Sequence, residues 1–250
     1  LGGVTRKELA ELAGLSPSTI GRIEQGTLDP TWGTLSRILE GTGYRLNGGT
    51  VVSAGDPMAI AAARPVLESW FAPAFAAKPE AGETVGNPWL SRWARAGWLS
   101  ERADPDDLVS VAVAAGNAGK IARRKIARRN VAFPEGWRNL ARRLDDENLA
   151  YAVTGLVAAR RDRATATTAS PVIYVEDPAL VVAKLGLEET SPGRGVLLIA
   201  PGGDELARTE VDGGVRFVSR AQGVLDAFAG SGREPDKAED ALRSLLAVPA

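Results

Sequence analysis

Three polar side chains with donors suited to nucleic-acid bases fall within one short stretch of the chain. Ser18, Thr19 and Arg22 recur at the three- and four-residue spacing that places side chains on one face of a helix. Ile20 falls on the opposite face, where it would pack inward. Hydroxyls donate to base edges, and an Arg guanidinium fits the two acceptors of guanine bidentately, so these three residues are the candidates for base contact. The candidates for phosphate contact beside them are Arg6, Ser16 and Gln25.

Local signals place these side chains on short helices joined by a glycine turn. Thr5 and Glu8 form a capping box that begins the first helix, which ends at a glycine. Ser16 is the N-cap of the second helix, and a proline occupies its first turn, where a missing N–H costs nothing. A third helix follows Asp29-Pro30. The pattern predicts a helix-turn-helix, a motif whose second helix fits the major groove of DNA.

Three segments of this region also carry a resemblance to a known family: Val4–Ala10, Gly14–Ile20 and Arg22–Gly26. They resemble the phage-repressor class of helix-turn-helix, the Cro/cI or XRE type, nearly position by position. The resemblance implies a DNA-reading second helix. That family has a further helix before the position of Gly3, so we expect the first helix of the domain to be missing from this sequence. The alternative is a small helical core without a role on DNA.

Composition excludes several kinds of chemistry. The 250 residues include no cysteine and no histidine, which removes disulfides, thiolate metal sites, Ser-His-Asp triads and most zinc sites. We expect no catalytic residue, no metal ligand and no cofactor. No run of 18 apolar residues and no signal peptide is present, so the sequence predicts a cytoplasmic protein without a membrane partner.

A basic run in the middle of the chain is the second candidate for phosphate contact. Residues 116–163 hold twelve basic and five acidic side chains, net +7, within a chain of net charge −1. Lys and Arg release counterions when they neutralise the phosphate backbone. The alternatives are a solvated helix face, or a set of ion-pair partners for the acidic C-terminal part. The predicted contacts are Lys120, Arg123, Arg124, Lys125, Arg128 and Arg129, echoed by Arg138, Arg142, Arg143, Arg160 and Arg161.

We expect three domains. Residues 1–53 form the helix-turn-helix domain and end in a short strand near 50–53. Residues 54–135 form a helical, winged-helix-like module that contains the basic run, with a helix over about 57–77 and a linker over 78–87. Residues 136–250 form an α/β domain. The fold class is thus a mainly α N-terminal half followed by an α/β C-terminal domain, for which a degenerate nucleotidyltransferase-like fold is one candidate.

Apolar runs predict the elements of the α/β domain. Strands are expected at Val172–Val175, Val196–Ile199 and Val215–Val218. The helices between and after them are expected at Pro178–Leu185, Arg220–Phe228 and Pro235–Leu246.

Blocks in this C-terminal half carry a second resemblance. The blocks are Ala150–Ala159, Val172–Pro178, Ser219–Asp226, Gly232-Arg233 and Ala238–Arg243. In this order they resemble the AbiEi family of type IV antitoxins. Members of that family join a DNA-binding N-terminal domain to this domain, repress their own operon and antagonise a nucleotidyltransferase-like toxin. An XRE-type N-terminus in place of the usual winged helix is a departure from the family.

The same half also resembles a nucleotidyltransferase core, with Thr154-Gly155 in the place of the small glycine motif that precedes a helix in such enzymes. Such enzymes hold Mg²⁺ on alternating carboxylates of one strand. Here the strand is apolar, and Glu176 and Asp177 follow only at its end, on opposite faces if the strand continues. The sequence favours a non-catalytic regulator that binds a double-stranded DNA operator as a homodimer, with a nucleotidyltransferase-like toxin as a second partner. A protein-interaction adaptor for a basic partner is the remaining alternative.

Overall fold

The computed structural model describes residues 5–71, 87–100, 103–161 and 171–247. They form two compact units, the first within 1–124 with 243–250 and the second within 125–242. These units differ from the three predicted domains. The helix-turn-helix and the module after it share one unit, and the second unit begins well before residue 136.

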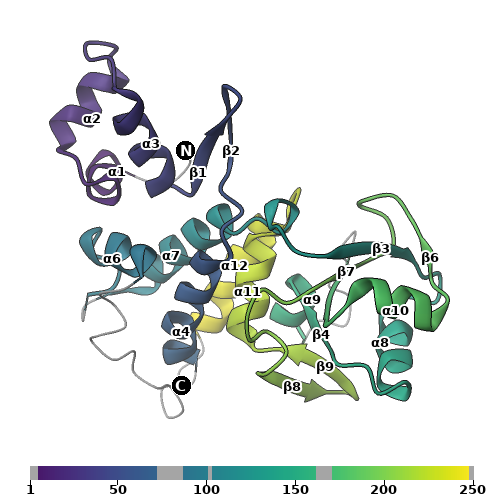
Figure 1. Ribbon diagram of the computed structural model, residues 1–250. Coiled ribbons are helices and arrows are strands. Elements are labelled where there is room, and N and C mark those ends of the chain that lie inside the picture. Colours follow the sequence, from purple (N-terminus) through teal and green to yellow (C-terminus); the bar gives the residue numbers. More distant parts are fainter. Residues whose placement is uncertain (1–4, 72–86, 101–102, 162–170, 248–250) are drawn as a thin grey trace. The chain divides into compact units, whose positions relative to one another are not determined.

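The helix-turn-helix consists of α1 (Arg6–Ala13), α2 (Pro17–Glu24) and α3 (Trp32–Gly41), shown in purple in Figure 1. The predicted capping box is present, since the Glu8 amide donates to Thr5 Oγ1 at 3.3 Å and the Thr5 amide donates to Glu8 Oε2 at 2.7 Å. Gly14 ends α1 in the left-handed conformation (φ 64°) that favours glycine. The three helices close around a small apolar core of Leu9, Ala10, Ala13, Ile20 and Ile38.

A β-hairpin follows α3, formed by β1 (Tyr44–Asn47) and β2 (Thr50–Ser53). Its strand at 50–53 was predicted, whereas its first strand was not. Gly48 and Gly49 make the turn with φ of 56° and 83°, the left-handed pair that a two-residue hairpin turn requires. The Ser53 hydroxyl donates to the carbonyl of Asn117 at 2.6 Å, which fixes the base of the hairpin.

A helical layer supports the helix-turn-helix from below in Figure 1. It consists of α4 (Pro57–Phe71), α6 (Pro88–Arg95) and α7 (Pro105–Ala118), followed by the 3-10 turn Ile121–Arg123. The predicted helix tail over 72–77 and most of the predicted linker lie outside the described residues. The described part of 54–124 holds helices and turns without a strand after Ser53, which differs from the predicted winged-helix-like module.

A buried tryptophan and a close backbone approach connect this layer to the helix-turn-helix. Trp98, 2% exposed, donates from its indole nitrogen to Glu8 Oε1 at 3.1 Å. Gly43 approaches α7 so closely that a Cβ there would lie 2.7 Å from the backbone nitrogen of Ala118. The predicted division at residue 53 is therefore a change of secondary structure inside one unit and not a boundary between separate cores.

Glu8→Ala should lower the stability of this unit by about 1–2 kcal/mol, because it removes the capping box and leaves the buried Trp98 indole without its acceptor. Urea unfolding followed by circular dichroism measures the loss, with Glu11→Ala on the same helix as the control. Burial raises the pKa of Glu8, but the hydrogen bonds from Thr5 and Trp98 and the charge of Lys7 outweigh it and leave the pKa lowered. This contribution is therefore present above the ordinary pKa of 4.5 and is lost as the pH falls through the lowered value. Equal losses in both variants would contradict the assignment.

The second unit is built on a seven-stranded mixed sheet in the order β6-β3-β7-β5-β4-β9-β8. The pairs β5–β7 and β4–β9 are parallel and the other neighbours are antiparallel. The strands are β3 (Arg128–Ala132), β4 (Tyr151–Thr154), β5 (Val172–Val175), β6 (Glu188–Glu189), β7 (Val196–Ile199), β8 (Thr209–Asp212) and β9 (Val215–Val218). Every residue of β4 and β5 is buried, so the centre of the sheet is covered on both faces.

Five helices accompany this sheet in the described residues. They are α8 (Trp137–Asp146), α9 (Leu156–Ala159), α10 (Pro178–Leu185), α11 (Arg220–Phe228) and α12 (Glu234–Leu246). The three predicted strands and the predicted helices at 178–185 and 220–228 have the bounds that the sequence indicated, and α12 begins one residue earlier. A mixed sheet with helices confirms the α/β assignment, while a nucleotidyltransferase-like fold stays a prediction.

A buried polar cluster joins β4, β5 and α11. Three donors converge on one oxygen, Asp226 Oδ2: the Thr154 hydroxyl at 2.7 Å, the Tyr174 hydroxyl at 3.0 Å and the Gln222 amide at 3.0 Å. All four side chains are at most 2% exposed. Buried polar groups are tolerated when they form hydrogen bonds with one another. This cluster therefore fixes the position of α11 against β4 and β5.

Candidate nucleic-acid interface

The Ser16 side chain organises the start of the predicted recognition helix, α2. Its hydroxyl oxygen accepts from the Thr19 amide at 3.1 Å, which makes it the N-cap. The same oxygen lies 2.9 Å from Ser18 Oγ and 2.8 Å from Thr19 Oγ1. Three hydroxyls therefore form one connected group at the exposed N-terminal end of α2, where backbone N–H groups also favour anions. Ser18 is exposed, whereas Thr19 is half-buried.

Arg22 is the best-placed side chain of α2 for a base. It is exposed and follows Ser18 by four residues, on the same helical face. No hydrogen bond or ion pair holds its guanidinium within the described part of the chain. Its backbone carbonyl accepts from the Thr27 amide at 2.9 Å and from the Thr27 hydroxyl at 3.1 Å, which ends the helix just beyond it. The backbone of α2 at Arg22 is therefore held in place, while the Arg22 side chain is available to contact a base.

Arg6 reaches α2 through an ion pair with Glu24. Arg6 Nε lies 2.8 Å from Glu24 Oε2, and both side chains are about half exposed. Its guanidinium crosses Gly21, where a Cβ would lie 3.3 Å from Arg6 Nη1. Exposed ion pairs are weak, so a phosphate can compete for Arg6 without a large loss of stability. Gln25 is the exposed C-cap residue of α2.

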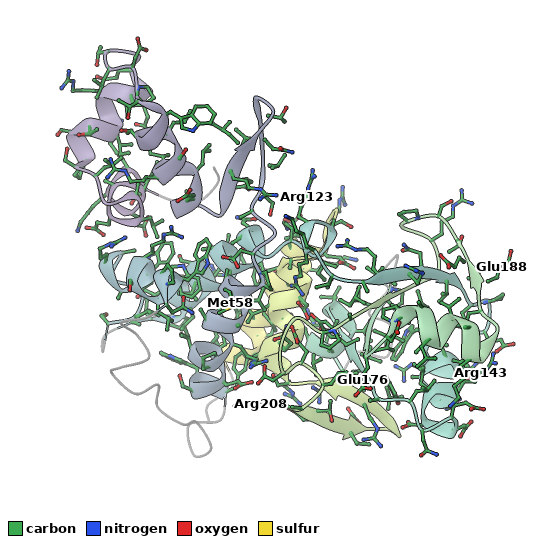
Figure 2. All side chains as sticks on the ribbon, viewed as in Figure 1. Met58, Arg123, Arg143, Glu176, Glu188 and Arg208 are labelled. Carbon is green, nitrogen blue, oxygen red and sulfur yellow. The ribbon has the colours of Figure 1, made fainter. Side chains whose placement is uncertain are left out.

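The structure divides the basic run between the two units. In the first unit, Lys120 directly precedes the 3-10 turn and Arg123 is its last residue, whereas Arg128 begins β3 of the second unit. The run is therefore neither a single helix face nor a continuous patch of one element. Arg123 and Lys125 are exposed, and Figure 2 labels Arg123.

Burial removes Arg124 from the predicted phosphate contacts. Its side chain is 3% exposed, and its Nε donates to the carbonyl of Gly119 at 2.8 Å. The sequence could not distinguish Arg124 from the neighbouring cations, because the burial of one of six cations in ten residues depends on the folded structure. Arg129 is also partly committed, since its Nε lies 3.4 Å from Glu189 Oε1 and its Nη1 donates to the carbonyl of Arg128.

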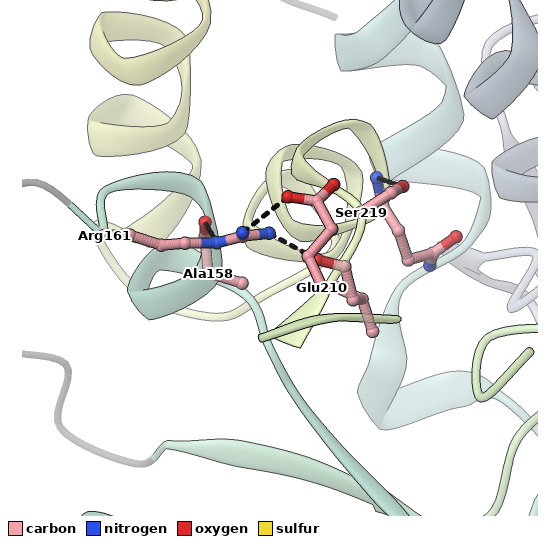
Figure 3. A network of polar contacts seen from close by, with 6 residues as sticks. Ala158, Arg161, Glu210 and Ser219 are labelled. Carbon is pink, nitrogen blue, oxygen red and sulfur yellow. Dashed lines mark hydrogen bonds and ion pairs between the residues drawn. The ribbon is translucent and has the colours of Figure 1, made fainter. Parts of the chain in front are cut away.

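Arg161, one of the cations that echo the basic run, is part of a structural network (Figure 3). Its guanidinium donates to Glu210 at 2.7 Å, to the carbonyl of Val218 at 2.6 Å and to the carbonyl of Ala158 at 3.2 Å. It also stacks 5.0 Å from the ring of Phe217. With 7% of its side chain exposed, Arg161 ties α9 to the β8–β9 hairpin and is not available to a phosphate.

The two carboxylates at the end of β5 have separate roles. Asp177 is the N-cap of α10, and its Oδ1 accepts from the amides of Ala179 and Leu180 at 2.9 and 3.1 Å. Glu176 is exposed beside it. No group of three or more acidic residues in the described chain converges in the way that a metal site requires.

One exposed aromatic side chain of the helix-turn-helix is not among the residues predicted from the sequence. Trp32 is 70% exposed in the first turn of α3, directly after the N-cap Thr31. The exposure of Trp32 could have been predicted from the sequence. Thr31 is an N-cap type of residue, and the inward-facing residues of the helix after it begin only at Leu35, which leaves Trp32 on the outer side.

Comparison with known proteins adds one finding to this geometry. Residues 2–47 match the model of a family described as a helix-turn-helix domain. The chain carries a helix-turn-helix domain. The match supports the predicted XRE-like motif, and this domain indicates a DNA-binding regulator. No curated protein and no solved structure matches the chain. None of the described helices is both long and apolar enough to span a membrane.

Proposed function

We propose that this protein is a sequence-specific transcriptional regulator that binds a double-stranded operator through α2. The observation that carries the proposal is the exposed face of α2, where no side chain of the described residues holds Arg22 and Ser18 lies one turn before it. A fixed backbone with an available guanidinium is the arrangement that reads guanine in the major groove. Ser18 and Thr19 supply shorter donors, and Arg6, Ser16 and Gln25 supply phosphate contacts.

We further propose that the regulator is the antitoxin and autorepressor of a toxin–antitoxin or phage-defence operon, working as a homodimer in the cytoplasm. The support is the resemblance of the C-terminal half to the AbiEi family. The cluster around Asp226 adds to it, because Thr154, Tyr174 and the Gln222–Asp226 pair come from three separate blocks of that resemblance. The partner of the second unit would then be a nucleotidyltransferase-like toxin.

A reporter assay tests the proposal in cells. The DNA upstream of the gene drives a reporter, and the full chain is expected to repress it, whereas Arg22→Ala is not. The neighbouring gene, expressed alone, should arrest growth, and co-expression of this chain should restore it. Repression without rescue would remove the antitoxin role and leave the regulator. Rescue of growth without repression of the reporter would refute the role as a transcriptional regulator.

The exposed cations of the basic run should contribute nonspecific affinity for DNA. Replacing Arg123 and Lys125 by Ala should flatten the dependence of log K on log salt by roughly 0.9 for each phosphate that these cations neutralise in the wild type. Binding should weaken alike on operator and scrambled DNA. Fluorescence anisotropy across a salt series measures both slopes, and Arg208→Ala, an exposed cation outside the run, is the control. An unchanged slope would assign these side chains to solvent.

The second unit is proposed to bind and not to transfer nucleotides. Asp177 uses one carboxylate oxygen to cap α10, and Asp226 is buried on α11, so neither is presented with Glu176 to one metal ion. Purified protein with Mg²⁺ and labelled nucleoside triphosphates should show no transfer to itself, RNA or protein. Incorporation that disappears in Glu176→Gln would overturn this proposal and favour an enzyme.

A further inference from the structure

The register of the β1–β2 hairpin determines which backbone groups point outward. Asn47 pairs with Thr50 on either side of the two-residue turn, and Leu46 pairs with Val51. In such a hairpin the pair next to the turn exchanges hydrogen bonds, and the following pair does not. The N–H and C=O groups of Val51 therefore point away from β1, toward the outer edge of β2.

The outer edge of β2 is open in the described structure. β1 contacts α3 on its other side, and Figure 1 shows β1 between α3 and β2. Among the residues that the structure describes, the two strands form a sheet of their own without a third strand. The Val51 side chain is 50% exposed, and no hydrogen bond to its backbone is formed by another described residue. An open edge of this kind is a template for another strand.

The edges of the larger sheet are protected differently. β6 consists of Glu188 and Glu189, and β8 carries Glu210 and Asp212, so both outer strands present carboxylates. Short length and charge are the usual means by which proteins keep edge strands from pairing. β2 reads Thr-Val-Val-Ser, with neither a charge nor a proline. The molecule thus protects its other sheet edges and leaves this one able to pair.

We propose that β2 pairs with β2 of a second copy of this chain and forms the dimer interface of the regulator. A two-fold axis at Val51 places the two Val51 residues opposite each other, where their outward N–H and C=O groups exchange two hydrogen bonds. Thr50 then lies opposite Val52 of the second copy, and the two hairpins form a four-stranded antiparallel sheet.

A second copy fits this edge for a physical reason. An antiparallel strand edge is complementary to itself about a two-fold axis, and β2 has no charge that would repel its own copy. A two-stranded hairpin is also marginal by itself, so additional strands stabilise it. The inference rests on the proposed function in one respect, that a single helix-turn-helix needs a second copy to read a two-fold operator.

The absence of cysteine from the whole chain allows a direct test by crosslinking. Directly opposed residues of this type have Cα atoms about 5.5 Å apart, within the range that a disulfide spans. Val51→Cys should therefore convert most of the full-length protein to a disulfide-linked dimer under mild oxidation. Val211→Cys, at the 67% exposed Val211 of edge strand β8, is the matched control and should remain mostly monomeric. Equal crosslinking at both positions would overturn the proposal.

Two further variants separate the interface from folding and from DNA binding. Light scattering should give twice the chain mass of 26.2 kDa for the wild type and the single mass for Val51→Lys. Val51→Pro should also be monomeric and retain its hairpin, because it removes only an outward N–H, whereas Val52→Pro removes a hydrogen bond within the hairpin. A wild type that is monomeric, or a dimer unchanged in Val51→Lys and Val51→Pro, would refute the interface. A wild-type protein that forms the dimer but does not bind the operator would instead refute the proposed function.

Discussion

Asp226→Ala should destabilise the second unit by about 3–5 kcal/mol, the largest effect expected for a single substitution in this protein. The carboxyl oxygen Oδ2 accepts from the hydroxyls of Thr154 and Tyr174 and from the amide of Gln222. Removing it leaves three donors in a region that is at most 2% exposed, where water cannot replace the acceptor without opening the packing. Each buried donor that loses this acceptor costs on the order of 1–3 kcal/mol.

Urea unfolding measured by circular dichroism tests this prediction. Because the chain forms two compact units, the variant should unfold in two steps, with the second unit unfolding first. Asp212→Ala, an exposed carboxylate on β8, is the control and should change stability by no more than about 0.5 kcal/mol. A loss below about 1 kcal/mol for Asp226→Ala would show that the donors find other partners, and the cluster would then not fix α11.

Arg22→Ala should weaken operator binding by about 1–3 kcal/mol and relax discrimination at one base pair. The reason is the available guanidinium on the exposed face of α2, which no other side chain in the described structure holds. Because the backbone of α2 is fixed by its own caps at Ser16 and Gln25, the substitution should leave the helix in place. The loss then reports the contact and not the fold.

Competition gel shifts with operator and scrambled DNA measure the two parts of this effect. Lys7→Ala, which removes an exposed cation of α1, is the control and should weaken binding to both DNAs by similar small factors. If Arg22→Ala also weakens binding to both DNAs equally, the residue contacts phosphate, and the assignment of base reading to Arg22 is wrong.

Local signals predicted much of this structure. Thr5 and Ser16 cap their helices as expected, and Asp177-Pro178 begins α10 at the predicted residue. These features depend on neighbours within a few residues, so the sequence carries them directly. The strand at Val172–Val175 was equally clear, because a short apolar run bounded by turn residues has few other interpretations.

Features that depend on distant partners could not be predicted. Strand β3 begins with the last two cations of the basic run, and it forms because β6 and β7 pair with it from either side. The burial of Arg124 depends on the fold around Gly119. The bond between Trp98 and Glu8 joins residues 90 positions apart, so the single unit made by the helix-turn-helix and the helical layer had no local signal.

The proposed function requires that α2 recognise a specific DNA sequence. The most direct measurement is the affinity of the purified full chain for DNA from its own upstream region, compared with a scrambled duplex of equal length and composition at physiological salt. The operator should be bound more tightly than the scrambled duplex by a factor of about 10³ or more, the lower range for specific regulators. Equal affinity for both duplexes, with the same dependence on salt, would contradict it.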